Sequence, residues 1–116
     1  MNCVINPLTA IFRVPNNKIS VNSLKGIRDS VISECRAVAA NEGVILEAGL
    51  EESLSKILVE YSNLSSMCQD ILKGKHTEIE FLNGKVSQLG DKYNIPTPVN
   101  DTLASLIRFM EGKIWR

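Results

Sequence analysis

Two predicted helices meet in residues 63–84, which read NLSSMCQDILKGKHTEIEFLNG. Ser65 and Ser66 precede a short amphipathic segment, Gly74 interrupts it, and the tripeptide HTE at 76–78 opens a second helical pattern. Hydroxyl, amide and carboxylate groups therefore come together where one helix stops and the next begins. A junction of this kind can present polar groups without burying them unpaired. The stretch predicts a helical chain that carries its polar groups at this junction.

Helical spacing extends through the rest of the chain, and no segment alternates at the period of two that marks a strand. The apolar pattern predicts six helices, which cover residues 1–12, 23–41, 47–61, 65–73 and 78–93, with a last one from Asn100 that carries Ile114. Short loops that contain Pro, Asn and Gly join them. We therefore expect an all-α fold of about six helices in one domain, residues 1–116.

The first predicted helix contains a proline and lacks a cap. Pro7 has no N–H, so it leaves the Cys3 carbonyl without its helical donor, and this predicts a kink. No residue before Asn2 can serve as an N-cap. We therefore expect that the natural chain begins earlier.

Several residues are placed to end helices or to bring them close together. Ser23 and Asn100 are predicted N-caps, and Gly43 is a predicted C-terminal stop. Gly84 and Gly90 lie in the fifth predicted helix, where each glycine lowers helix propensity by roughly 1 kcal/mol relative to Ala. We expect these two glycines where a neighbouring helix or a ligand approaches closely.

The composition excludes several classes of protein. The 116 residues include 13 basic and 13 acidic side chains, mixed along the chain, so nothing indicates a nucleic-acid or membrane-surface partner. No apolar run approaches the ~20 residues of a membrane span, and the first residues lack the pattern of a signal peptide. Cys3, Cys35 and Cys68 are odd in number and form no CxxC pair. They predict buried, reduced thiols in a cytoplasmic protein, and no metal site.

Four motifs, in order along the chain, resemble the C-terminal domain of the ketopantoate reductase (2-dehydropantoate 2-reductase) family. They are NPLTA at 6–10, SSM with QD at 65–70, HTEIE with NG at 76–84, and PTPVN at 96–100. The resemblance covers essentially the whole chain. It implies a helical domain of the type seen in 6-phosphogluconate dehydrogenase relatives.

The resemblance also implies a reaction, and it implies an N-terminal cofactor-binding domain that this sequence does not include. The family reduces the ketone of 2-dehydropantoate with NADPH, which sits on an N-terminal Rossmann domain with a Gly-rich phosphate turn. No GxGxxG occurs in this chain. The family's proton-donor lysine lies one helical turn before the position of Asn2, outside the chain. We therefore expect the chain alone to be inactive. Its expected partners are its own N-terminal domain, a 2-keto acid and a second copy of the chain.

Glu78 is the first candidate for a functional residue. A carboxylate at a helix start is favoured by the helix dipole, so one interpretation is that Glu78 stabilises the helix. The resemblance implies another role, because the family's glutamate at this position lies beside the nicotinamide and the substrate. There it can orient a substrate hydroxyl or tune a nearby lysine. Glu80, two residues on, is predicted to be solvated.

Three asparagines and a serine are the candidate substrate ligands. An amide can hold a carboxylate, keto oxygen or hydroxyl without adding charge. Asn16 could instead shape a turn, while Asn2 and Asn6, which share one helical face, could bond backbone near the kink. The resemblance places all three, with Ser66, at substrate-binding positions. Ser66 could also cap the helix that follows, in competition with Ser65.

The remaining polar residues of the junction carry weaker predictions. His76, the one histidine, is expected at the surface or near a helix cap rather than in acid–base catalysis. Asp70 and Gln69 are expected to stabilise the loop. Two alternative functions remain open: a helical module that associates without chemistry of its own, and a reductase of another 2-keto acid.

Overall fold

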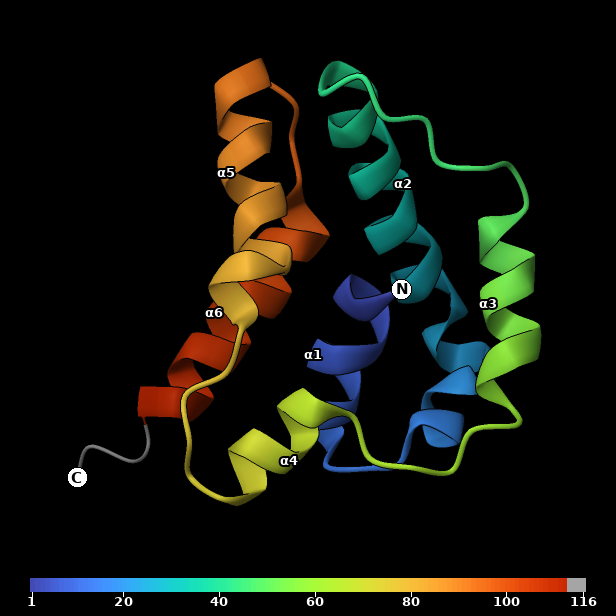
Figure 1. Cartoon of the computed structure of the whole chain (residues 1–116), viewed down its shortest axis with the longest axis vertical. Helices are drawn as coiled ribbons and strands as arrows, with labels where there is room; N and C mark the ends of the chain where they lie inside the picture. Colours follow the sequence, from blue (N-terminus) through green and yellow to red (C-terminus); the bar gives the residue numbers. More distant parts are fainter. Residues whose placement is uncertain (113–116) are drawn as a thin grey trace.

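The structure is a computed structural model that describes residues 1–112. Six α-helices make up the fold, and the described residues contain no strand (Figure 1). The helices are α1 (Asn2–Phe12), α2 (Lys25–Asn41), α3 (Leu50–Leu58), α4 (Ser66–Leu72), α5 (Asn83–Tyr93) and α6 (Pro98–Gly112). Three short 3₁₀ helices join them: η1 (Asn16–Ser20), η2 (Asn22–Leu24) and η3 (Ile79–Phe81). The all-α prediction is confirmed; Ile114 lies outside the described residues.

Helix α1 lies at the centre of the molecule, with α2 and α3 on one side and α5 and α6 on the other (Figure 1). It contacts α2, α4, α6 and η1. Most of its length is buried, and Val4, Leu8 and Ala10 are almost completely so. Burying side chains such as Val4 and Leu8 contributes roughly 1.5–3 kcal/mol each, which explains why α1 is the helix around which the others pack.

Two apolar clusters form the core, and both α1 and α6 contribute to each. The larger one consists of Val4, Leu8, Ile19, Val31, Ile32, Cys35, Leu54, Leu58 and Leu103. The smaller one consists of Ala10, Met67, Cys68, Ile79, Ala104 and Ile107. The smaller cluster brings α4 and η3 onto α1, so the junction at residues 63–84 is built against the central helix.

Pro7 is accommodated without ending α1, which runs helically from Asn2 to Phe12. The predicted loss of a donor is confirmed, because the Cys3 carbonyl accepts a hydrogen bond from Asn83 Nδ2 at 2.9 Å. The kink itself stays a prediction. The first turn closes on the chain start, where the Met1 carbonyl accepts from the amides of Val4 and Ile5.

The predicted helix over residues 78–93 is wrong as a single element. Leu82, with φ −113° and ψ −103°, lies outside the helical region and separates η3 from α5. The break turns Asn83 inward, where it is completely buried. A close approach does occur at Gly90, but it comes from the loop after α5 and not from a neighbouring helix or a ligand: a Cβ there would lie 2.7 Å from the Ile95 carbonyl oxygen.

Both predicted N-caps are also wrong. Ser23 lies in η2, because Arg28 donates to the carbonyls of Ile19 and Val21 at 2.7 and 2.8 Å and fixes that segment as short turns. Asn100 is completely buried within α6, whose first bond joins the Asp101 amide to the Thr97 carbonyl. Helix α6 therefore begins at Pro98, where a proline lacks only a donor that the helix does not use.

The third helix is shorter than the predicted range 47–61. Gly49 has a φ of 82°, a left-handed conformation that holds the preceding residues outside the helix. The helix then ends at Leu58, which leaves Tyr61 exposed. Gly43, with a φ of 79°, follows the end of α2 as predicted. None of the helices in the described part of the chain is long and apolar enough to cross a membrane.

Candidate functional site

The polar face of α1 is the base of the candidate site. Asn2, Asn6 and Thr9 follow one another at steps of four and three, so they lie on one face of the helix. The Thr9 hydroxyl lies 2.7 Å from Ser65 Oγ, in a buried contact between α1 and the start of α4. This face therefore points toward the junction from which Ser66 comes.

Ser65 and Ser66 have separate roles in the structure. Ser65 is the N-cap of α4, because its Oγ accepts the Cys68 amide at 3.1 Å. Ser66 is the first residue of the helix and is exposed, and its hydroxyl makes no hydrogen bond within residues 1–112. The alternative interpretation of Ser66 as the cap is therefore wrong, and its hydroxyl is free to meet a ligand.

Asn6 is the most constrained of the predicted residues. Only 7% of it is exposed, yet its side-chain amide has no hydrogen-bond partner among the described residues. Its amide atoms are not among the buried unpaired side-chain atoms of the described residues, which are the side-chain oxygens of Asn16, Asn17 and Asn83. Asn2, one turn earlier, is exposed. The pair thus offers amide groups that the fold itself does not use.

Asn16 is the first residue of η1 and is partly buried. Its amide N–H donates to the Asn63 carbonyl at 3.0 Å, which ties η1 to the segment before α4. Its Oδ1 is buried and has no partner in the described residues, and the same is true of Asn17 Oδ1. Asn16 therefore shapes the backbone through its main chain, while its buried side-chain oxygen has no partner among the described residues.

Glu78 precedes η3 and is exposed. Its carboxylate caps nothing, and it has no hydrogen bond or ion pair within the described part of the chain. Glu78 thus stands at the N-cap position of η3 without a side-chain capping bond, and its interaction with the helix dipole stays a prediction. Its neighbour Ile79 is buried with Ala10 of α1 and Met67 of α4, which places Glu78 beside the same junction as Ser66.

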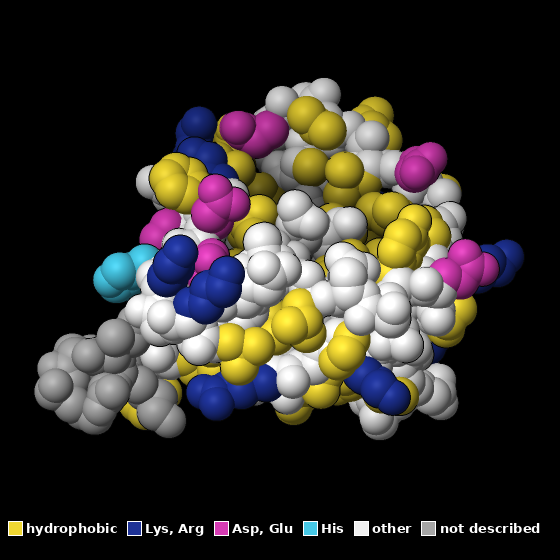
Figure 2. Space-filling view, turned by 60° about the horizontal axis from the view of Figure 1, so that its bottom comes forward, with side chains coloured by type: hydrophobic (Ala, Val, Ile, Leu, Met, Phe, Trp, Pro, Cys, Tyr) yellow, Lys and Arg dark blue, Asp and Glu magenta, His cyan; other side chains and the backbone are white. Residues whose placement is uncertain are grey.

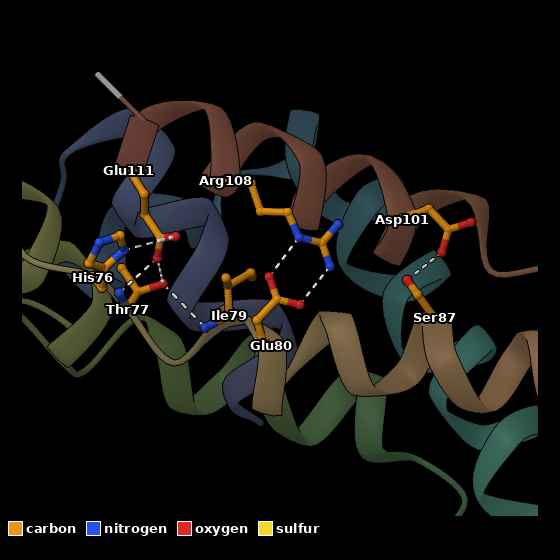
Figure 3. A network of polar contacts seen from close by, with 8 residues as sticks. All are labelled: His76, Thr77, Ile79, Glu80, Ser87, Asp101, Arg108 and Glu111. Atoms are coloured by element: carbon orange, nitrogen blue, oxygen red, sulfur yellow. Dashed lines mark hydrogen bonds and ion pairs between the residues drawn. The ribbon is translucent and has the colours of Figure 1, made fainter. Parts of the chain in front are cut away.

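The segment that carries Glu78 is fastened to α6 (Figure 3). The backbone amide and the hydroxyl of Thr77 both donate to Glu111 Oε2, at 2.7 and 2.6 Å. Thr77 Oγ1 also accepts the Ile79 amide at 3.2 Å. His76 lies next to this contact with its Nδ1 3.7 Å from Glu111 Oε1, and 86% of its side chain is exposed. The predicted surface position of His76 is confirmed.

Glu80 is exposed, as predicted, but it also forms an ion pair with a neighbouring helix. Its carboxylate accepts two hydrogen bonds from Arg108 of α6, at 2.7 and 2.8 Å (Figure 3). The Arg108 guanidinium lowers the pKa of the Glu80 carboxyl. Ser87 and Asp101 form a further contact between α5 and α6. The predicted loop role of Gln69 is confirmed, since its Nε2 donates to the Leu64 carbonyl at 3.2 Å.

Sequence reasoning missed a buried amide network behind α1. Asn83 Nδ2 donates to Asn100 Oδ1 at 2.9 Å, and Asn100 Nδ2 donates to Glu34 Oε1 at 2.8 Å. The Glu34 carboxylate also accepts the amides of Val99 and Asn100 at the start of α6. The signal that could have found it is Pro7, whose missing N–H requires another donor for the Cys3 carbonyl.

Cavities in the structure lie away from the five predicted residues. One, of 390 Å³, is lined by charged residues that include Asp29, Arg36 and Glu51. Another, of 280 Å³, is apolar and lies between α1, α2 and α6. The described residues contain no cluster of His, Cys, Asp or Glu that could hold a metal ion. Of the five predicted residues, Asn2, Ser66 and Glu78 are exposed, Asn16 is partly buried and Asn6 is almost completely buried.

Comparisons with known proteins identify the family of the chain. The family model described as Ketopantoate reductase PanE/ApbA C terminal matches residues 1–111. The chain is 39% identical over 114 residues to a 2-dehydropantoate 2-reductase of Archaeoglobus fulgidus, covering 97% of the chain and 38% of that relative.

Solved structures show the same fold. A PanE/ApbA family ketopantoate reductase from Ralstonia eutropha JMP134 matches with a TM-score of 0.91 and 34% identity, over 99% of this chain and 39% of that one. A ternary structure of D-mandelate dehydrogenase with NADH and anilino(oxo)acetate matches with a TM-score of 0.87 and 25% identity, over 99% of this chain and 39% of that one.

The fold and these matches define the class of protein, which is a helical domain like the C-terminal domain of the ketopantoate reductases. The chain belongs to the ketopantoate reductase PanE/ApbA family. It spans about 38% of the length of the curated relatives that it matches. The family resemblance is thereby confirmed, while the roles of the five individual residues stay predictions.

Proposed function

We propose that residues 1–116 form the substrate-binding domain of an NADPH-dependent reductase that converts 2-dehydropantoate to pantoate, in cytoplasmic pantothenate biosynthesis. The observation that carries the proposal is the set of polar groups without partners around the α1–α4 junction. The Asn6 amide, the Ser66 hydroxyl and the Glu78 carboxylate have no partner among the described residues, although neighbouring polar groups are paired. Groups left unpaired by the fold remain available to a ligand.

The substrate is held by groups of matching chemistry. Asn2, Asn6, Asn16 and Ser66 offer N–H and O–H donors for the carboxylate and keto oxygen of a 2-keto acid. Their neutral side chains orient the substrate without adding charge. Glu78, the one carboxylate of the set, lies at the cofactor end of the substrate, where it orients the substrate hydroxyl or tunes a lysine.

NADPH supplies the hydride when it is bound by the N-terminal nucleotide-binding domain. The described residues contain no Gly-rich phosphate turn, so this chain contributes Glu78 and the substrate contacts. The lysine that donates the proton to the developing alkoxide also comes from upstream. The active site therefore lies between two domains, a common position for such sites. The exposure of Asn2, Ser66 and Glu78 and the 38% share of the relatives' length support this proposal.

A second possible function is the same reduction of a different 2-keto acid. The similar D-mandelate dehydrogenase structure contains NADH and anilino(oxo)acetate, a 2-oxo acid derivative with an aromatic group. A fold of this kind therefore accommodates other 2-oxo compounds and the other nicotinamide cofactor.

A second candidate from another class is a helical module that associates with a second copy and has no chemistry of its own. Apolar side chains interrupt the polar surface of the face drawn in Figure 2. Phe12 of α1 is 50% exposed and lines the apolar cavity beside Leu106 of α6. This candidate predicts association in solution without binding of keto acids.

The test uses the protein with its upstream half included. NADPH absorbance is followed with 2-dehydropantoate and a panel of other branched and aromatic 2-keto acids, and NADH is tested in parallel. Selective reduction of 2-dehydropantoate with NADPH, lowered in Glu78→Ala, is the expected result. Activity on another keto acid alone would replace the substrate. No turnover on any of them, with self-association measured by sedimentation, would favour the module.

The 116-residue chain by itself is expected to give no turnover, because the cofactor site and the proton-donor lysine lie outside it. Measurable oxidation of NADPH by the purified chain would contradict the proposal that the cofactor site and the lysine belong to the N-terminal domain.

A further inference from the structure

A buried amide from the start of α5 closes a gap in the backbone hydrogen bonding of α1. Pro7 cannot donate to the Cys3 carbonyl, so this carbonyl needs a donor from another element. Asn83 supplies it from 80 residues away, with its Nδ2 at 2.9 Å from the carbonyl oxygen. Asn83 is completely buried, so water does not take its place.

The position of the Asn83 amide is fixed by a second acceptor. Its Nδ2 also donates to Asn100 Oδ1 at 2.9 Å, and Asn100 is in turn held by the Glu34 carboxylate of α2 at 2.8 Å. Two acceptors on one side require that the nitrogen of Asn83 faces them, which settles the orientation of the amide. Helices α2, α5 and α6 therefore converge on one carbonyl of α1.

The side-chain amide of Asn83 has a paired nitrogen and an unpaired oxygen. Asn83 Oδ1 is buried and has no hydrogen-bond partner among the described residues. An apolar side chain of similar size would avoid the cost of this unpaired acceptor. The presence of asparagine therefore indicates that the donor function of its nitrogen outweighs the cost of its oxygen.

Asn83 binds the first turn of α1, and the same turn carries two proposed substrate ligands. Cys3 lies about 100° around the helix from Asn2, and Asn6 lies one turn further along the face of Asn2. Asn83 thus holds the turn from the side, while Asn2 and Asn6 are left free of it. The main-chain bond from the Ile5 amide to the Met1 carbonyl, at 3.1 Å, belongs to the same turn.

We infer that Asn83 is a positioning residue for substrate binding, which acts through the Cys3 carbonyl to set the geometry of Asn2 and Asn6. This inference rests on the proposed function of these two asparagines. It adds a residue that touches neither substrate nor cofactor, and it assigns to Pro7 the role of creating the dependence on Asn83.

The test is a double-mutant cycle in the protein with its upstream half included. Asn83→Leu is expected to raise KM for 2-dehydropantoate about tenfold while kcat stays within about threefold, because the interaction serves binding. Pro7→Ala restores an N–H that can donate to the Cys3 carbonyl. The Pro7→Ala/Asn83→Leu variant is therefore expected to have a KM within about threefold of Pro7→Ala alone. Independent effects of the two changes on KM would overturn the inference.

Two further variants separate positioning from general destabilisation. Val38→Ala removes a buried methyl pair from α2 away from α1, and it is expected to lower stability and leave KM unchanged. If Asn83→Leu does not fold, Asn83→Ser takes its place in the cycle, because its shorter side chain does not reach the Cys3 carbonyl. A rise in KM in Val38→Ala equal to that in the Asn83 variant would also overturn the inference.

A readout that does not depend on activity keeps the inference distinct from the proposed function. Hydrogen exchange at the Ile5 amide reports opening of the first turn of α1. Asn83→Leu is expected to speed this exchange about tenfold, and Pro7→Ala is expected to restore most of the protection. If the protein binds no keto acid, the proposed function fails, and unchanged exchange at Ile5 would independently overturn the positioning role.

Discussion

Glu78 and Glu80 lie two residues apart on one segment, yet their carboxylates have opposite surroundings. Glu80 faces α6 and accepts two hydrogen bonds from Arg108, whereas Glu78 has no partner among the described residues. Ser65 and Ser66 differ in the same way, since Ser65 caps α4 and Ser66 bonds nothing in the described chain. The comparison teaches that paired polar groups of this junction hold the fold and that the unpaired ones remain for a ligand.

The largest expected effect separates the two glutamates. In the protein with its upstream half, Glu78→Ala is expected to lower kcat/KM for 2-dehydropantoate about a hundredfold, because a carboxylate at the reacting end of the substrate is lost. Glu80→Ala is the matched control and is expected to leave kcat/KM within about twofold. Steady-state kinetics of both variants measures the difference. Equal losses in the two variants would break the comparison.

The two serines are expected to differ by a smaller amount. Ser66→Ala is expected to lower kcat/KM about tenfold, the effect of one lost hydrogen bond to the substrate, without a change in stability. Ser65→Ala removes an N-cap and is expected to cost about 1 kcal/mol of unfolding free energy in the 116-residue chain. Urea unfolding and kinetics of both variants are compared. Loss of stability in Ser66→Ala would assign it a structural role instead.

A change at Thr77 tests whether a paired polar group of the junction stabilises the fold. Thr77→Val keeps the shape and removes the hydroxyl that donates to Glu111, so it is expected to lower the unfolding free energy by about 1 kcal/mol. Thr102→Val is the matched control, because the Thr102 hydroxyl bonds only to its own helix at the Pro98 carbonyl and is exposed. Denaturation of the two variants should therefore give different midpoints. Identical midpoints would contradict a stabilising hydrogen bond from the Thr77 hydroxyl to α6.

The smallest expected effect is a pH dependence at Glu80. Arg108 lowers the pKa of this carboxyl below its ordinary value of 4.5. A lowered pKa in the folded chain means that the stabilisation is present above about pH 4.5 and is lost as the pH falls through the folded value. Because both groups are exposed, the contribution is small. The unfolding midpoint of Arg108→Gln should differ less from that of the original chain at low pH than at pH 7, and a constant difference would contradict this origin.

Most helices could be predicted from the sequence, because apolar spacing reflects burial against one core. The α-helical class, the end of α2 at Gly43 and the surface position of His76 all follow from local chemistry. The caps could not be predicted in this way. Asn100 is a common N-cap residue, but in the structure its amide binds Glu34 and Asn83, residues distant in sequence. Local propensity does not contain such long-range partners.

The candidate site could be predicted in its residues and not in its geometry. Motif resemblance selected Asn6, Ser66 and Glu78, but only the structure distinguishes the capping serine from the unpaired one. The break at Leu82 is equally hidden in the sequence, since the apolar stripe continues across it and Asn83, the next residue, bonds the distant Cys3 carbonyl. Pro7 was a visible signal for a missing donor, although nothing in the sequence identified the side chain that replaces it.

The central claim is that polar groups unpaired in this fold serve the substrate, and Asn6 tests it most directly. Asn6→Leu replaces a side chain that is only 7% exposed and makes no hydrogen bond within the described residues by an apolar side chain of similar size. The account predicts that kcat/KM for 2-dehydropantoate falls by more than about tenfold, while the unfolding free energy of the 116-residue chain is unchanged or higher. Retained activity together with a loss of stability would contradict the account, because Asn6 would then serve the fold.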